Sequence, residues 1–161
     1  MEAIQATRFR IINKLLEPYF ASGDLELIHC NYGYLCFTTR ALHKRFGKLG
    51  NGQWQDLPDM YYFTISFDAE DKLTLKKKGI DIELWLYAQS DVRNLENERL
   101  SGKEGLGSVY SKKGFDLMYK QTILPLKESK AEQEANNGIL MAKLIEFVEV
   151  KLPRIEAALL G

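Results

Sequence analysis

Two carboxylates and a lysine near the middle of the chain have the residue types of a metal-dependent hydrolytic site. Asp59 follows Pro58, and ten residues separate it from the run Glu70-Asp71-Lys72. In sites of this kind two carboxylates hold a divalent cation, and the lysine positions or activates the attacking water. The spacing therefore raises one hypothesis of activity, a compact metal-dependent nuclease that uses Asp59, Glu70 and Lys72.

The hydrophobic pattern around these residues predicts strands that keep the carboxylates apart. Apolar and polar residues alternate from Met60 to Lys77, on both sides of a short polar connection at 69–71. Such alternation is typical of a β-hairpin with one buried face. Asp59 would then precede the first strand while Glu70 lies at its far end, roughly 26 Å away at about 3.3 Å per residue. The pattern favours a core hairpin over a catalytic site, and its expected buried face comprises Tyr61, Phe63, Ile65, Phe67, Leu73 and Leu75.

A histidine and two cysteines are the other side chains that could bind a metal or attack a substrate. A zinc site needs three or four ligands, and the adjacent His29 and Cys30 should point to opposite faces of a strand. Nothing in the sequence pairs Cys30 or Cys36 with His43 as a base–thiol couple. The glycine-rich run 102–108 lacks the spacing of a phosphate-binding loop. We therefore predict free thiols, no metal and no cofactor.

Basic residues form local clusters, although the formal net charge of the chain is +0. One cluster surrounds positions 40–48, a second covers 72–78, and the loop 101–114 adds further lysines. Cations beside aromatic rings are what nucleic-acid binding uses, whereas lysines along a solvated sheet edge also prevent unwanted strand pairing. The predicted contact residues are Arg40, Lys44, Arg45, Trp54, Lys72, Lys76, Lys77, Lys78, Lys103, Lys112 and Lys113.

Length and composition are those of one globular domain spanning 1–161. The chain has 161 residues, of which 45% are hydrophobic and 27% charged. This is enough to bury a core and too apolar for a disordered chain. Charges are spread through the apolar positions of the N-terminal segment, which argues against a signal peptide or a membrane-spanning helix. Two cysteines without a secretory signal favour a reducing compartment, so we predict a cytoplasmic protein without a membrane partner.

The remaining patterns predict helices at both ends of a run of strands. Helical spacing predicts an N-terminal helix over about 2–21 and a C-terminal helix over about 129–152, which Pro153 kinks or breaks. Strands are expected over 25–30, 32–39 and 115–125, and over 80–88, which is also compatible with a helix. Ser90 or Asp91 should cap a helix that reaches about Leu100. The segment 40–48 is a short helix or an irregular connector, and 101–114 a flexible loop. The expected fold class is α+β, with an antiparallel meander-like sheet of about five or six strands packed against both terminal helices.

The order of these features resembles the C-terminal half of certain bacterial and phage proteins of the PD-(D/E)XK nuclease superfamily. The resemblance is carried by YGYLCFTT, the loop with Trp54, YYFTISFDAEDKLTLKKKG, FDLMYKQTIL and FVEVKLPRIEAAL. In those proteins the catalytic core lies N-terminal to this region, and the C-terminal half is an accessory α+β unit. The resemblance therefore implies a stand-alone accessory domain from a phage or bacterial defence setting, and it transfers no catalytic residue to this chain.

Three functional hypotheses follow from these observations. The leading one is a non-catalytic domain that contacts nucleic acid or a protein partner through a lysine-rich sheet edge and the loop 101–114. The metal-dependent nuclease is the alternative, and a protein inhibitor or regulatory subunit is the third. The sequence leaves the oligomeric state open.

Overall fold

The computed structural model describes residues 3–30, 34–46, 60–66, 79–125 and 129–161. Its strands are β1 (Leu25–Cys30), β2 (Tyr34–Thr39), β3 (Met60–Ser66), β4 (Gly79–Tyr87), β5 (Tyr110–Lys112) and β6 (Phe115–Pro125). Its helices are α1 (Ala3–Ser22), α2 (Arg40–Phe46), α3 (Ser90–Leu100), α4 (Lys130–Glu146) and α5 (Leu152–Leu160), with a 3₁₀ turn η2 (Lys103–Gly105) and a π-helical turn η3 (Phe147–Lys151).

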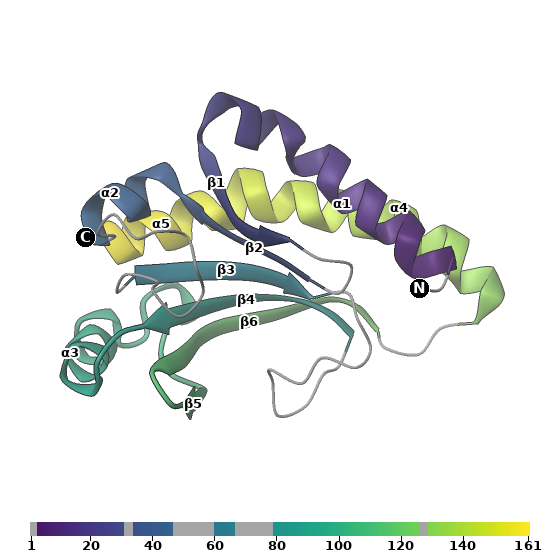
Figure 1. Ribbon diagram of the computed structural model, residues 1–161. Coiled ribbons are helices and arrows are strands. Elements are labelled where there is room, and N and C mark those ends of the chain that lie inside the picture. Colours follow the sequence, from purple (N-terminus) through teal and green to yellow (C-terminus); the bar gives the residue numbers. More distant parts are fainter. Residues whose placement is uncertain (1–2, 31–33, 47–59, 67–78, 126–128) are drawn as a thin grey trace.

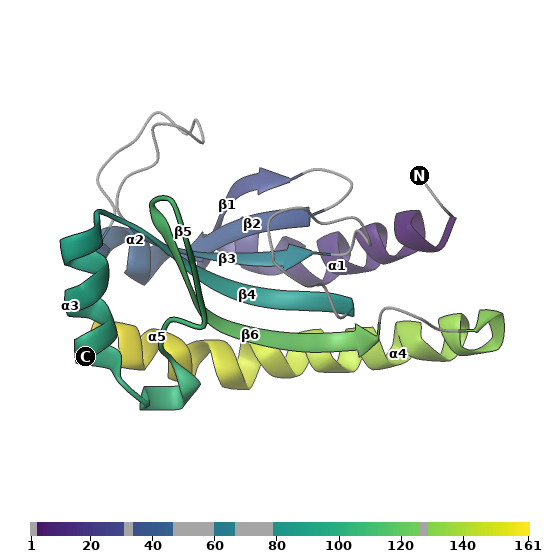
Figure 2. The ribbon, with the colours of Figure 1, turned by 90° about the horizontal axis from the view of Figure 1, so that it is seen from below.

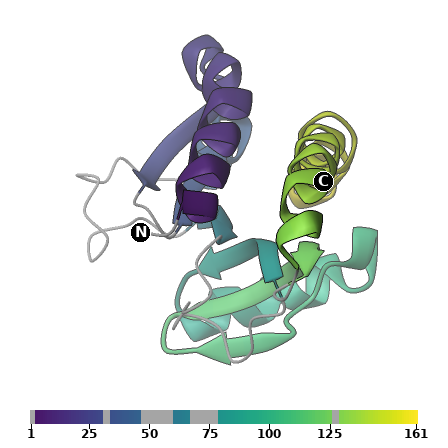
Figure 3. The same cartoon turned by 90° about the vertical axis from the view of Figure 1, so that its right-hand side faces the viewer.

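The strands form one antiparallel sheet in the order β1-β2-β3-β4-β6-β5. Figure 1 shows α1, α4 and α5 on one side of this sheet, and Figure 3 shows α1 and the C-terminal helices next to each other above it. The predicted α+β class is therefore confirmed. The order departs from a simple meander at one point, because β5 precedes β6 in the chain but lies outside it at the sheet edge.

The helix layer is held over the sheet by two parallel helices. Arg8 Nε of α1 donates to Asn137 Oδ1 of α4 at 3.2 Å, and the Tyr19 hydroxyl donates to Glu149 Oε1 of η3 at 3.2 Å. Since residue number rises along both helices between these two bonds, α1 and α4 run in the same direction. Within the described residues no helix is both long and apolar enough to cross a membrane.

The C-terminal helical stretch begins and continues for local reasons. Ser129 and Glu132 form a reciprocal capping box, in which the Ser129 hydroxyl accepts from the Glu132 amide and the Glu132 carboxylate accepts from the Ser129 amide. Pro153 lies in the first turn of α5, and the turn before it is π-helical. Proline lacks an N–H donor, and the wider π turn precedes the place where that donor is missing. The chain thus stays helical past the position where the sequence predicts a kink or break.

β3 lies in the interior of the sheet and is paired along both edges. It pairs with β2 from Tyr34↔Ser66 to Phe37↔Phe63, and with β4 from Ser66↔Asp81 to Met60↔Tyr87. The strand predicted over 80–88 is confirmed as β4, and it takes the place that the sequence assigned to 72–77. That assignment was wrong because a strand has only two edges, and both edges of β3 are occupied from Phe63 to Ser66. The segment 67–78 lies outside the described residues.

The second face of β3 is buried as well, which corrects the expectation of one buried face. Tyr62, Thr64 and Ser66 are only 1%, 6% and 3% exposed, like their neighbours on the helix-facing side. On that side Phe63 stacks on Phe37 with ring centroids 5.6 Å apart and meets the edge of Phe147 at 6.0 Å. The core therefore joins β2, β3 and η3 through three phenylalanine rings.

Three shorter elements also refine the sequence prediction. The segment after β2 is helix α2, not an irregular connector. Helix α3 begins at Ser90, but its N-cap is Gln89 and no side chain caps it, so the predicted capping role of Ser90 or Asp91 was wrong. The expected loop 101–114 contains η2 and strand β5, which pairs with β6 from Tyr110↔Leu117 to Lys112↔Phe115.

Candidate nucleic-acid interface

A row of polar side chains crosses the sheet on the face away from α1, α4 and α5. The strand register places His29 opposite Cys36, Cys36 opposite Thr64, Thr64 opposite Glu83, and Glu83 opposite Lys120. This row was not predicted from the sequence, although alternate charged residues in the otherwise apolar run IDIELW mark one polar face of β4. Only the pairing of distant strands brings the five residues into line.

Two buried carboxylates of β4 lie on this face, and one of them, Asp81, is paired with Lys120. Asp81 and Glu83 are 1% and 2% exposed. Asp81 Oδ1 accepts from the Thr122 hydroxyl at 2.7 Å, and its Oδ2 lies 3.5 Å from Lys120 Nζ. Buried charges persist in proteins when they are paired in this way. Among the residues that the structure describes, no three His, Cys, Asp or Glu side chains group as metal ligands.

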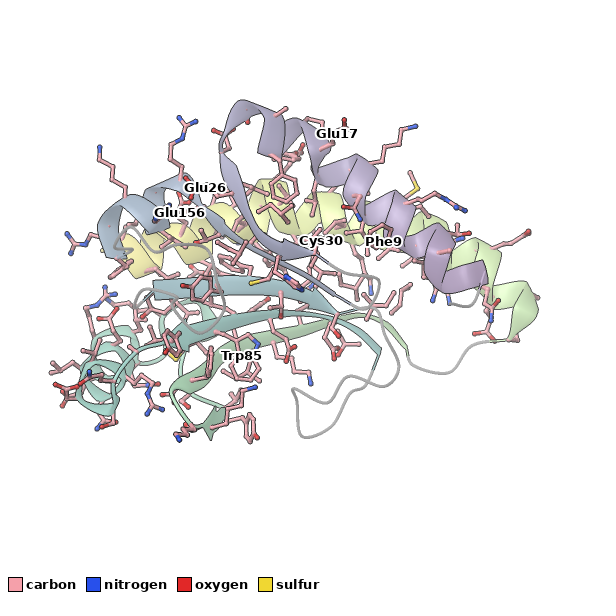
Figure 4. The ribbon with its side chains drawn as sticks, in the orientation of Figure 1. Phe9, Glu17, Glu26, Cys30, Trp85 and Glu156 are labelled. Atoms are coloured by element: carbon pink, nitrogen blue, oxygen red, sulfur yellow. The ribbon has the colours of Figure 1, made fainter. Side chains whose placement is uncertain are left out.

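The two cysteines lie on opposite faces of the sheet. Cys30 and its sequence neighbour His29 also point to opposite faces, so they cannot bind one metal ion together. Cys30 pairs with Leu35 on the helix side, whereas Cys36 and His29 are opposite each other on the other side. Figure 4 shows Cys30 between α1 and the sheet, and Cys30 Sγ lies 3.9 Å from Asn13 Oδ1. Burial raises the pKa of the Cys36 thiol to about 12. A nucleophilic cysteine needs a lowered pKa, so Cys36 is a core residue and not a catalytic thiolate.

The raised pKa of Cys36 gives the folding stability a dependence on alkaline pH. The folded protein keeps this proton above the ordinary thiol pKa of 9.0, at which the unfolded chain releases it. The stabilisation is therefore complete below 9.0 and is lost as pH rises toward about 12. We expect the free energy of unfolding to fall across this window, and to fall less steeply in Cys36→Ala. Urea unfolding at about pH 8 and about pH 11 measures how much free energy of unfolding each protein loses between the two pH values. An equal loss in the unmodified protein and in Cys36→Ala would contradict the prediction.

The surface also has an apolar groove of about 220 Å³ between α1 and the C-terminal helices. Leu15 and Tyr19 line one wall, and Ile145 and Val148 line the other. Ligand sites of drug-sized molecules usually measure about 300–1,000 Å³ and contain several convergent polar groups. This groove is smaller, and its two polar rim residues are already engaged, because the Tyr19 hydroxyl donates a hydrogen bond to the Glu149 carboxylate. We therefore assign it to helix packing.

Six of the predicted contact residues lie in described parts of the chain, and all six are at one end of the sheet. Arg40, Lys44 and Arg45 are on α2, directly after the last residue of β2. Lys112 and Lys113 are at the turn between β5 and β6, beside the end of β4, because Tyr87 pairs with Phe115. The sixth is Lys103 on η2, which contacts α5 as α2 does. Figure 2 shows α2, α3 and the β5–β6 hairpin gathered at this end.

Arg40 has a structural task that was not evident from the sequence. Its guanidinium donates to the carbonyls of Ser22 and Gly23, at 3.1 Å each, and thereby caps the C-terminus of α1. Gly23 has φ +83°, and a Cβ there would lie 2.0 Å from Arg40 Nη2. Glycine is thus needed at this position for its backbone conformation and for the close approach of Arg40.

The remaining cations at this end lack salt bridges with other described residues, although the nearby charge of Arg45 helps to lower the pKa of Glu96. Lys44, Arg45, Lys103 and Lys113 are exposed, and none of them forms a salt bridge with a residue that the structure describes. Two of the cations lie over aromatic rings: the Lys112 ammonium lies over Trp85 and Phe115, and the Arg45 guanidinium lies 5.8 Å from the centroid of the Phe46 ring.

Several carboxylates at the same end are already engaged within the fold. His43 Nδ1 contacts Glu26 Oε2, and Arg93 forms a salt bridge with Asp116. The Arg99 guanidinium donates hydrogen bonds to both carboxylate oxygens of Glu96. Burial opposes the charge of Glu96, but the bonds from Arg99 and the Tyr61 hydroxyl outweigh it and lower its pKa. Exposed carboxylates remain on α3 and η2, so the cations of α2 and the hairpin have no exposed carboxylate on their own elements, whereas Lys103 of η2 is next to Glu104. These carboxylates are Asp91, Glu98 and Glu104.

The other candidate residues predicted from the sequence lie outside the described residues. This applies to the hypothetical catalytic set Asp59, Glu70 and Lys72, and to the predicted contact residues Trp54, Lys76, Lys77 and Lys78. The lysine-rich sheet edge was expected next to β3, but β3 is an interior strand, and the edges of the described sheet are β1 and β5. On the edge strand β5, the lysine is Lys112.

Comparisons of the chain with family models, with curated proteins and with solved structures return no match. The resemblance to the accessory half of PD-(D/E)XK proteins therefore stays a prediction, and a function has to be inferred from the geometry of the domain itself.

Proposed function

We propose that this chain is a non-catalytic binding domain that contacts nucleic acid through a basic end. The basic end comprises Lys44, Arg45, Lys103, Lys112 and Lys113. The observation that carries the proposal is that four of these cations are exposed and form no salt bridge with other described residues. Unneutralised cations on one surface attract a polyanion because binding releases its condensed counterions.

The spacing of the basic end suits a phosphate backbone. α2 follows β2 and the hairpin precedes β6, so three strand spacings separate them. At about 4.8 Å each, they span roughly 14 Å across the end of the sheet. This distance corresponds to about four nucleotides at about 3.4 Å of rise per nucleotide. A nucleic-acid strand that crosses the end of the sheet would therefore meet α2 and the hairpin in one binding event.

A zero net charge supports a local contact in place of a general attraction. The chain carries 22 basic and 22 acidic residues, so its overall field neither steers nor holds nucleic acid. Binding must then depend on a few residues whose removal has a large effect. Helix α2 has two of them, Lys44 and Arg45, and no acidic residue.

Reversing two charges on α2 tests the proposal. In the double variant Lys44→Glu and Arg45→Glu we expect affinity for a labelled oligonucleotide to fall by more than about tenfold at low salt. The slope of log affinity against log salt should shrink by about 0.7–0.9 for each phosphate that the variant no longer neutralises. Fluorescence anisotropy across a salt series measures both quantities.

The matched control is the double variant Arg10→Glu and Lys14→Glu on α1. It makes the same change of net charge on an exposed helix away from the basic end. The control should bind almost as the unmodified protein does. An equal loss in both variants would show a non-specific charge effect and contradict the proposal, as would undiminished binding after the change on α2.

A further inference from the structure

The β5–β6 hairpin carries aromatic rings beside its lysines. Trp85 and Tyr87 come from β4, Tyr110 from β5 and Phe115 from β6, and we refer to these four residues as the ring cluster. All four belong to the sheet face opposite the helices, since Leu84 and Leu86 of β4 point into the helix-side core. Figure 4 shows Trp85 on that side of the sheet.

The ring cluster is built around Trp85, which is 6% exposed. The edges of Tyr110 and Phe115 meet its indole with centroids 6.3 Å away in both cases. Tyr87 lies against Phe115 at 4.7 Å. The three outer rings remain partly exposed, and the cluster thus combines a rigid centre with rings that reach the surface.

One lysine ammonium group lies directly on this cluster. Lys112 Nζ is 5.1 Å from the centroid of the Trp85 ring and 5.3 Å from that of Phe115. Lys113 follows at the turn and is exposed. A phosphate held by the Lys112 ammonium would therefore lie within one nucleotide of the rings.

The turn keeps the lysines and rings together. Gly114 has φ +84°, a backbone conformation that favours glycine, and a Cβ there would lie 3.2 Å from the Tyr87 ring. The carboxylate of the hairpin, Asp116, is buried and bonded to Arg93, Asn97 and Ser111, so its charge is compensated inside the fold. The outer surface of the hairpin is consequently basic and aromatic.

We propose that the domain binds single-stranded nucleic acid, with an unpaired base stacked on Tyr110 and the adjacent phosphates on Lys112 and Lys113. This proposal rests on the proposed nucleic-acid function and names the form of its ligand. Aromatic side chains beside a basic track are how proteins bind single strands, because every unpaired base offers a π face. In a duplex the neighbouring base pairs cover those faces, so the rings would gain nothing from it.

The test compares an oligothymidylate of about 12 nucleotides with the duplex that it forms with oligoadenylate. Fluorescence anisotropy should show tighter binding of the single strand by the unmodified protein. Tyr110→Leu should weaken single-strand binding by about tenfold, as loss of a base–ring stack does, and leave duplex binding unchanged. Tyr110→Phe, which keeps the ring, should retain the affinity of the unmodified protein. The matched surface control is Val109→Thr, at the neighbouring exposed position.

The outcomes separate this inference from the proposed function. If the change on α2 weakens binding of both oligonucleotides while Tyr110→Leu weakens neither, stacking is refuted and the nucleic-acid function stands. Duplex binding at least as tight as single-strand binding likewise overturns the inference. If neither oligonucleotide binds, or if polyglutamate binds as tightly as oligothymidylate, both proposals are wrong. Circular dichroism and urea unfolding of Tyr110→Leu verify that a loss of affinity is not a loss of fold.

Discussion

Replacing Phe63 by alanine is expected to reduce the free energy of unfolding by about 3–5 kcal/mol. Phe63 is fully buried in an interior strand, and its ring stacks on Phe37 of β2 and meets the edge of Phe147 of η3. The substitution removes the transfer free energy of the ring and leaves a cavity that strands paired on both sides cannot close. It also removes ring contacts that each add about 0.5–1.5 kcal/mol beyond burial.

Urea unfolding of Phe63→Ala, followed by circular dichroism, measures this effect. Leu95→Ala is the matched control, because Leu95 is 65% exposed on α3 and its truncation should change stability by less than about 0.5 kcal/mol. If Phe63→Ala is too unstable for an unfolding measurement, Phe63→Leu leaves a smaller cavity and loses less free energy of unfolding. A change below about 1 kcal/mol in Phe63→Ala would show that Phe63 is not in the core.

Replacing Asp116 by alanine is expected to cost about 3–5 kcal/mol for a different reason. The Asp116 carboxylate accepts from Arg93 at 2.8 Å, from Asn97 at 2.9 Å and from Ser111 at 2.7 Å. It thus ties α3, β5 and β6 together next to the turn of the hairpin. Its removal leaves the guanidinium of Arg93, whose side chain is 16% exposed, without its counter-ion, and an uncompensated charge of this kind is strongly destabilising.

A double-mutant cycle identifies the cause of that loss. Arg93→Met combined with Asp116→Ala should be less destabilising than Asp116→Ala alone, because the stranded charge is removed with its partner. Urea unfolding of the two single variants and the double variant gives the coupling free energy. Additive effects, with no coupling above about 0.5 kcal/mol, would contradict the role assigned to the ion pair.

The partial success of the sequence prediction follows from the range of the interactions involved. Helix α1, strand β4 and the start of α4 at Ser129 were predictable because their signals, periodicity and capping chemistry, lie within a few residues of each other. The strand partners of β3 were not predictable, since the alternation of apolar and polar residues indicates which residues form a strand but not which strand they pair with. The predicted partner was the next run in sequence, whereas the sheet pairs β3 with β2 and β4.

The candidate interface shows the same division. The basic character of α2 is visible in the sequence, and so are the lysines of the β5–β6 turn. That Arg40 caps α1 was not visible, nor that the rings of Trp85, Tyr110 and Phe115 meet under Lys112. These contacts join residues from separate strands or helices, and their geometry depends on register.

The amino-acid sequence by itself determined the types of the terminal helices and of most strands, the α+β class and the presence of local basic clusters, because each depends on neighbouring side chains. Only the tertiary structure decided that β3 is interior, that both of its faces are buried, and that the six described contact residues predicted from the sequence come to one end of the sheet. The physical reason is that hydrogen bonding between strands and burial of both sheet faces minimise the free energy of the whole chain, and no single segment contains that information.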